Sequence, residues 1–142
     1  MRFLVVAALL VGCNDLRDFA GTWDGRRVGD DPVLRVGVSA TAHATLSIAQ
    51  CDTHVFRGLL SIDGLLQPTE VDSIAGVEAD ALSDLTFAGS PLRVFMAFVP
   101  MSDGHGDAIA VIGLFADHRI DIRIMRQGAS PVYAIFAFQP QS

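Results

Sequence analysis

The residues that could do chemistry in this chain lie mostly apart, and the densest polar group is a single loop. Asp103, His105 and Asp107 occupy alternate positions in this loop, with Gly104 and Gly106 between them. Two carboxylates and an imidazole could hold a hard or borderline metal ion, but no ligand from another segment completes such a site. Glycine, which tolerates a positive φ, and aspartate, which hydrogen-bonds nearby backbone, are also typical of turns. We therefore predict a hairpin tip here and no metal site.

The composition excludes several catalytic mechanisms. All ten basic residues are arginines, which rules out a P-loop lysine, a Schiff-base lysine and a serine–lysine pair. The four histidines lie singly along the chain, there are only two glutamates, and no Gly-x-Ser-x-Gly motif marks a hydrolase nucleophile. We therefore predict that the protein is not an enzyme and that it uses no cofactor.

Length and charge narrow the class of protein further. A chain of 142 residues, 51% of them hydrophobic, suffices for one folded domain and is too apolar to be disordered. The formal net charge of −6 argues against a nucleic-acid partner, because phosphate binding needs a basic face. Cys51 is expected at the end of a strand as a buried, unreactive thiol, because a reactive thiol would want basic neighbours and Asp52 is acidic.

The N-terminal segment has the layout of an export signal. Met1 and Arg2 precede an uninterrupted apolar run over residues 3–11, which Gly12 and Cys13 follow. A positive charge, a short apolar stretch and a small residue are the parts of a cleavable signal. The run is too short to span a bilayer, which takes about 20 residues.

The end of that run, Leu10-Val11-Gly12-Cys13, resembles the lipobox of bacterial lipoproteins. The resemblance implies that residues 1–12 are a signal peptide, cut just before Cys13, and that the Cys13 thiol carries a diacylglycerol. It implies a location in the bacterial cell envelope, anchored in a membrane and facing the periplasm or the exterior. Cys13 would then be unavailable for a disulfide with Cys51.

After the first 18 residues, short apolar segments alternate with turn residues, and none has the period of a long helix. In the clearest segment, Ile120, Ile122 and Ile124 alternate with charged side chains. We expect residues 13–18 to form a short anchor linker and residues 19–142 a single all-β domain. The predicted strands are 20–28, 41–50, 54–62, 69–77, 80–87, 92–99, 107–115, 118–126 and 132–138.

An antiparallel meander of about eight strands must hide its edges. We predict that it closes as a small up-and-down barrel, with a two-sheet β-sandwich as the alternative. The segments 92–99 and 107–115 are apolar on both faces, so the outer face of the sheet is expected to be covered or contacted. A ligand inside the barrel, a partner outside it, or a central strand of a sandwich would each explain this surplus.

The tripeptide Gly21-Thr22-Trp23 at the start of the first strand is similar to the Gly-x-Trp opening of lipocalins and their calycin relatives. In that family the tryptophan lies across the closed end of the barrel, and a basic residue near the last strand stacks on it. The resemblance therefore implies a structural pair between Trp23 and an arginine. Arg126 and Arg123 both precede the last strand, and Arg126 is the preferred partner.

Two functions from different classes fit these observations. The first is a membrane-anchored envelope lipoprotein that binds a small apolar ligand in the mouth of its barrel. The second is a structural or protein-interaction module of the envelope with a filled core. The two differ in interior volume, because large residues such as Phe95, Phe98, Phe136 and Phe138 would fill an eight-stranded barrel if they pointed inward.

Overall fold

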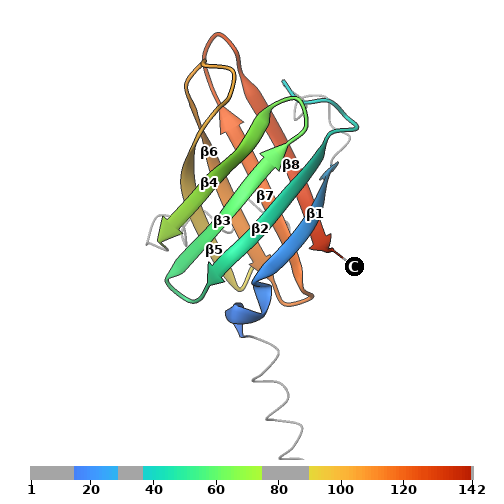
Figure 1. Cartoon of the computed structure of the whole chain (residues 1–142), viewed down its shortest axis with the longest axis vertical. Coiled ribbons are helices and arrows are strands. Elements are labelled where there is room, and N and C mark those ends of the chain that lie inside the picture. Colours follow the sequence, from blue (N-terminus) through green and yellow to red (C-terminus); the bar gives the residue numbers. More distant parts are fainter. Residues whose placement is uncertain (1–14, 29–36, 75–89, 142) are drawn as a thin grey trace, which may run out of the picture.

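The computed structural model describes residues 15–28, 37–74 and 90–141. They form one eight-stranded antiparallel sheet in the order β4-β3-β2-β1-β8-β7-β6-β5, wound into a nearly closed barrel (Figure 1). This confirms the predicted all-β meander closed as a barrel. The elements are η1 (Leu16–Phe19), β1 (Gly21–Val28), β2 (His43–Cys51), β3 (Val55–Ile62), β4 (Leu66–Ile74), β5 (Arg93–Pro100), β6 (Asp107–Phe115), β7 (Arg119–Arg126) and β8 (Val132–Pro140).

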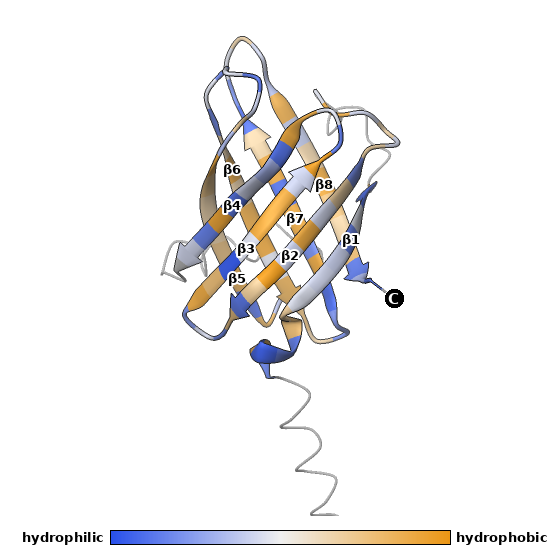
Figure 2. Cartoon of the chain, in the orientation of Figure 1, coloured by the Kyte–Doolittle hydropathy of each residue, from blue (hydrophilic) through white to orange (hydrophobic). Residues whose placement is uncertain are grey.

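The strands form where the sequence alternates, because successive side chains of a strand point to opposite faces. Figure 2 shows hydrophobic and hydrophilic residues following one another along several strands. In β7, Ile120, Ile122 and Ile124 are buried inside the barrel, while the residues between them are only partly buried. The predicted strand at 80–87 lies outside the described residues.

β4 begins three residues earlier than predicted. Gly64 turns the chain with a φ of 74°, and the Leu65 N–H donates to the Ile62 carbonyl at 3.0 Å. The strand therefore starts at once with Leu66 and includes Pro68. Proline is tolerated here because β4 lies at an edge of the sheet, where no ladder hydrogen bond is required of it.

The predicted linker is partly folded. Asp15 caps η1, a single 3₁₀ turn, by accepting a hydrogen bond from the Arg17 N–H at 3.0 Å, and Phe19 at the end of the turn is buried. Residues 16–18 therefore belong to the folded domain, which corrects the expectation of a linker over 13–18. Among the described residues, no helix is long and apolar enough to cross a membrane.

The seam between β4 and β5 is held by a side chain. In the described pairings these two edge strands share no ladder, but the buried Ser73 on β4 reaches the backbone of Met96 on β5. Its hydroxyl accepts a hydrogen bond from the Met96 N–H at 3.2 Å and donates one to the Met96 carbonyl. One hydroxyl thus takes the place of a missing strand partner.

Replacing Ser73 with alanine is therefore expected to destabilise the barrel by about 1–3 kcal/mol, because both Met96 backbone groups lose their partner. Urea denaturation measures this change. The matched control is Ser61→Ala on the neighbouring β3, away from the seam. An equal loss of stability in the two variants would contradict a special role for Ser73.

The barrel interior is one continuous core. Phe56 on β3 and Phe95 on β5 meet across the seam with ring centroids 5.5 Å apart, and Phe136 lies 6.4 Å from Phe138 on β8. Phe98, in contrast, is 69% exposed on the outside of the barrel. The largest fully buried side chains are Trp23, Phe56, Phe95, Phe136, Phe138, Leu46, Leu60, Ile62, Ile112, Leu114, Ile120 and Ile122.

The core is tightly packed around Phe138. Gly25 on β1 pairs with Phe138 on β8, and a Cβ at position 25 would overlap the Phe138 ring. No real Cβ makes so short a contact, so the glycine is required by close packing. The aromatic ring lies directly on the backbone of the opposite strand.

Candidate functional site

Trp23 closes one end of the barrel together with two other rings. Its indole Nε1–H donates to the Phe19 carbonyl at 2.9 Å, and the Phe19 ring stacks on it with centroids 5.7 Å apart. The His118 ring lies 4.9 Å from Trp23 and 5.1 Å from Phe19. His118 sits in the β6–β7 turn with a φ of 59°, which directs it over this end.

The predicted partners of Trp23 do not reach it. Trp23 pairs with Pro140 at one end of β8, whereas Arg126 pairs with Val132 at the other end. Eight residues of strand separate these positions by about 26 Å. The other candidate, Arg123, lies over the Tyr133 ring at 5.6 Å. The Trp23–Arg126 pair is therefore not formed. The first residues of β7 lie near Trp23, whereas Arg126 is the last residue of that strand.

Arg126 instead forms an ion pair at the opposite end of the barrel. Its Nη1 and Nη2 each lie 2.7 Å from one carboxylate oxygen of Asp103, and its Nε donates to the Ser130 carbonyl at 2.9 Å. The Arg126 side chain is almost completely buried, whereas Asp103 lies on the surface. The two-pronged geometry binds the β5–β6 hairpin to the end of β7.

This pairing also explains the loop that resembled a metal site. Asp103 accepts a hydrogen bond from the His105 N–H at 3.0 Å, and Gly104 and Gly106 have φ values of 75° and 104°. These are the features of the predicted hairpin tip, which is confirmed. Among the described residues, no group of three potential metal ligands comes together.

The Arg126 guanidinium holds the pKa of Asp103 well below its usual range, and the His105 N–H adds to this effect. An aspartate in the unfolded chain has a pKa of about 3.9. The contribution of Asp103 to stability is therefore complete above that pH and is lost as the pH falls toward its lower folded pKa.

We expect Asp103→Asn to remove this component of acid sensitivity. Below about pH 4, unfolding of the wild type should take up about one proton more than unfolding of the variant. Urea denaturation at a series of pH values between neutrality and strong acid measures the difference. Parallel pH profiles for the two proteins would contradict the assignment of Asp103 as an ionised partner of Arg126.

Of the two cysteines, only Cys51 lies among the described residues. Cys51 is buried, and burial raises the pKa of its thiol to about 12, with a further contribution from the charge of Asp52. The predicted burial of Cys51 is confirmed, and the raised pKa of its thiol agrees with the prediction that it is unreactive. Cys13, the predicted lipidation site, lies outside the described residues.

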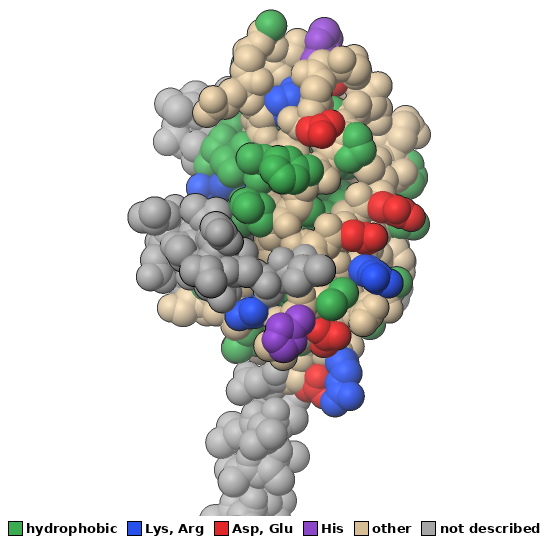
Figure 3. Space-filling model, turned by 90° about the vertical axis from the view of Figure 1, so that its left-hand side faces the viewer, with side chains coloured by type: hydrophobic (Ala, Val, Ile, Leu, Met, Phe, Trp, Pro, Cys, Tyr) green, Lys and Arg blue, Asp and Glu red, His purple; other side chains and the backbone are tan. Residues whose placement is uncertain are grey.

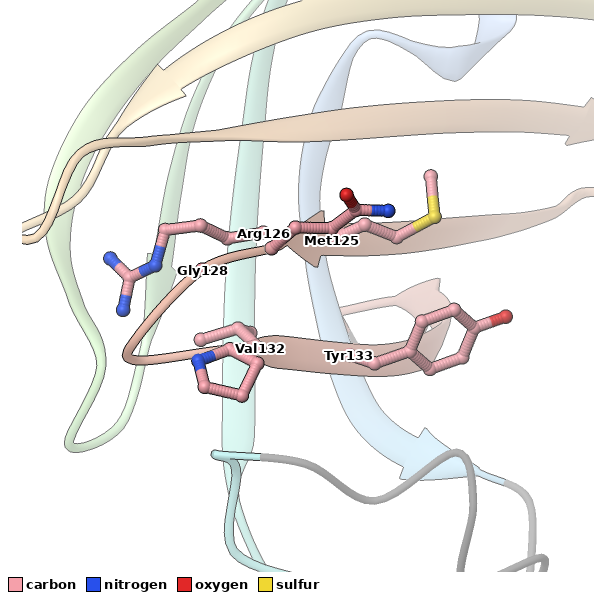
Figure 4. A pocket seen from close by; sticks show the side chains of 7 residues that line it. Met125, Arg126, Gly128, Val132 and Tyr133 are labelled. Atoms are coloured by element: carbon pink, nitrogen blue, oxygen red, sulfur yellow. The ribbon is translucent and has the colours of Figure 1, made fainter.

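A surface pocket of about 440 Å³ lies beside the β7–β8 hairpin (Figure 4). In Figure 4 the side chains of Met125 and Tyr133 extend to one side of the hairpin, while Arg126 extends the other way. No charge other than that of Arg126 lies among the described residues of its lining, and Asp103 balances that charge. The lining residues are Met125, Arg126, Gln127, Gly128, Pro131, Val132 and Tyr133.

Met125 also belongs to an apolar cluster on the outer face of the barrel. Val94, Val111 and Phe115 form the buried centre of this outer cluster, and Met125 packs against it. The apolar surplus predicted for β5 and β6 is therefore real, and part of it lies outside the barrel. Figure 3 shows a group of hydrophobic side chains on the face in view, with charged side chains near it.

Sequence reasoning missed His118 and Asp103 as the residues that close the two ends. The signal for Asp103 was in the same hairpin that suggested a metal site, but its partner lies 23 residues away on another strand. His118 could have been found from its place in the turn between two predicted strands. A comparison of the chain with models of known protein families, with curated proteins and with solved structures finds no match.

Proposed function

We propose that this protein is a lipid-anchored, non-catalytic module of the bacterial cell envelope that binds a partner through its outer surface. The filled barrel interior carries this proposal. Phe95, Phe136 and Phe138 point inward and are buried, and the Phe138 ring leaves no room for a side chain at position 25. An eight-stranded barrel has space for its own side chains or for one small ligand. The packing favours the filled-core alternative over a ligand in the lumen.

The outer surface offers a better binding site. The pocket beside the β7–β8 hairpin is mainly apolar, and Met125, Pro131 and Tyr133 supply contacts of different kinds. Methionine adapts its shape to a partner, while tyrosine combines an apolar ring with a polar hydroxyl. We propose that this pocket receives an apolar side chain of another envelope protein.

The predicted anchor would point the pocket away from the membrane. Only Asn14 separates Cys13 from Asp15, the cap of η1, so these two residues can lie at most about 7 Å apart. Trp23 closes one end of the barrel, and a lipid on Cys13 would hold that end close to the bilayer. The β7–β8 hairpin lies at the other end of β8, where it would be accessible to a partner.

The anchor is tested by metabolic labelling with palmitate in a bacterium that processes lipoproteins. We expect the wild type to incorporate the label and to sediment with membranes, and Cys13→Ser to lose both properties. A labelled Cys13→Ser variant, or an unlabelled wild type, would contradict the proposed anchoring.

The partner surface is tested by photo-crosslinking in intact cells. A photoreactive phenylalanine at Tyr133 is expected to give a discrete adduct, and one at the exposed Thr45 on β2 is not. The adduct should disappear when Met125 is replaced by aspartate, because a charge in the apolar pocket opposes binding. Equal adducts at both positions would contradict a specific site.

A small apolar ligand in the same pocket is the second candidate, because the lining carries so little polar surface. Native mass spectrometry of the Cys13→Ser domain after incubation with a lipid extract tests it. A discrete mass increment that Met125→Asp abolishes would support a ligand here. An increment that survives in Met125→Asp would contradict this location.

A further inference from the structure

Arg27 occupies an unusual position at the rim of the barrel. It alternates with Trp23 and Gly25 on β1 and pairs with the buried Phe136 on β8, so its side chain leaves the backbone on the interior face. Its Nε and Nη1 atoms are shielded from solvent, and neither has a hydrogen-bond partner in the part of the chain that the structure describes.

Such a group is costly for a folded protein. A guanidinium has N–H donors and no acceptor, so only acceptor atoms can satisfy Arg27. Buried polar groups nearly always have a partner, and an unpartnered one calls for a bound water or ion. A negatively charged partner would lower the cost most, because hydrogen bonds between charged groups are the strongest.

Other arginines of the described residues have such partners. Arg126 pairs with Asp103, and Arg17 pairs with Asp15. Arg123 also has an unpartnered Nε, but its guanidinium lies over the ring of Tyr133. Among the described residues, the Arg27 guanidinium has no ion pair or ring contact of this kind.

A surface pocket of about 270 Å³ adjoins Arg27 at this rim. Arg26 and His43 form a cross-strand pair between β1 and β2 at its edge, and Thr41 supplies a hydroxyl. Guanidinium, imidazole and hydroxyl groups can all donate hydrogen bonds, and no carboxylate is found among the described residues of the lining. The complete described lining is Arg26, Arg27, Ala40, Thr41, Ala42 and His43.

We propose that this rim pocket binds a phosphate-like oxyanion, and that Arg27 turns its guanidinium from the shielded position into the pocket to become the principal ligand. Arginine recognises such groups with several N–H donors at fixed angles, so it combines charge with geometry. Arg26 contributes a second positive charge, and Thr41 and His43 contribute hydrogen bonds. The site is separate from the pocket at the β7–β8 hairpin and does not depend on the proposed function.

Calorimetric titration of the full chain in detergent with inorganic phosphate tests the proposal, with potassium chloride at equal ionic strength as the reference. We expect one phosphate to bind per chain. Arg27→Met should weaken binding by at least about tenfold, the effect of losing a charged hydrogen bond. The matched control, Arg57→Met on the outer face of β3, should bind like the wild type.

Arg27→Met could disturb the rim itself, so a second variant keeps the test decisive. Arg26 and His43 are exposed, and the double change to glutamine should leave folding intact while it weakens phosphate binding severalfold. Wild-type binding no stronger than that of chloride would overturn the proposal. Unchanged affinity in the folded double variant, or in folded Arg27→Met, would overturn it too.

The phosphate could belong to a soluble molecule or to a lipid headgroup. Flotation of the Cys13→Ser chain with vesicles of phosphatidylglycerol, compared with phosphatidylcholine, separates the two sources. Arg27-dependent flotation with phosphatidylglycerol would support a headgroup ligand. Binding of inorganic phosphate without flotation would support a soluble one, and flotation that Arg27→Met leaves unchanged would count against this pocket.

Discussion

Replacing Trp23 with alanine is expected to lower the free energy of unfolding by about 3–5 kcal/mol. The indole is almost completely buried, donates to the Phe19 carbonyl and stacks on the Phe19 ring, so its loss leaves a cavity at the closed end. Trp23→Phe keeps most of the packing and loses the hydrogen bond, so it should cost about 1 kcal/mol. Urea denaturation measures both changes.

A double-mutant cycle identifies the partner of Trp23. The structure predicts that Trp23→Ala couples to His118→Asn, which removes the ring but tolerates the left-handed backbone at this position. The effects of Trp23→Ala and Arg126→Ala should be additive, because the two residues lie at opposite ends of the barrel. Strong coupling to Arg126 and none to His118 would instead support the pair that the lipocalin resemblance implies.

Replacing Gly25 with alanine is expected to destabilise the protein by about 1–3 kcal/mol through overpacking. The added methyl group would meet the Phe138 ring, which the surrounding core prevents from moving away. Combining the change with Phe138→Leu provides the missing space. The double variant should therefore be more stable than the sum of the two single effects predicts.

The Gly25 variant also bears on the proposed function. If Gly25→Ala costs almost nothing, the interior has slack around Phe138, and the argument for a filled lumen loses its support. A large cost that Phe138→Leu relieves would support a barrel filled by its own side chains. The outer surface would then remain the place for a partner, as the hairpin pocket and the exposed Phe98 suggest.

Much of the fold could be predicted because strand formation depends on local patterns. The alternation around Ile122 predicts β7 within one residue, and the apolar run at 107–115 coincides with β6. Turn residues such as Asp63 and Gly64 separate the strands. About eight short antiparallel strands joined by such turns have few ways to hide their edges, and the sequence leaves a barrel and a two-sheet sandwich as the candidates. The single eight-stranded sheet of the structure decides for the barrel.

The faces of apolar strands were harder to assign. Phe95 and Phe98 are both large enough to help fill the interior, yet they lie three residues apart and must point to opposite faces of a regular strand. Phe95 is buried and Phe98 is exposed. A segment that is apolar on both faces does not reveal which face is inside, because that depends on its register with its neighbours.

The sequence by itself determined the meander, the hairpin tip at Asp103 and the burial of Cys51, since each depends on residues close together in the chain. Only the tertiary structure decided which residues close the barrel: His118 beside Trp23 at one end, and Arg126 with Asp103 at the other. The physical reason is register. Which side chains meet depends on how strands far apart in the sequence align, and local periodicity carries no information about that alignment.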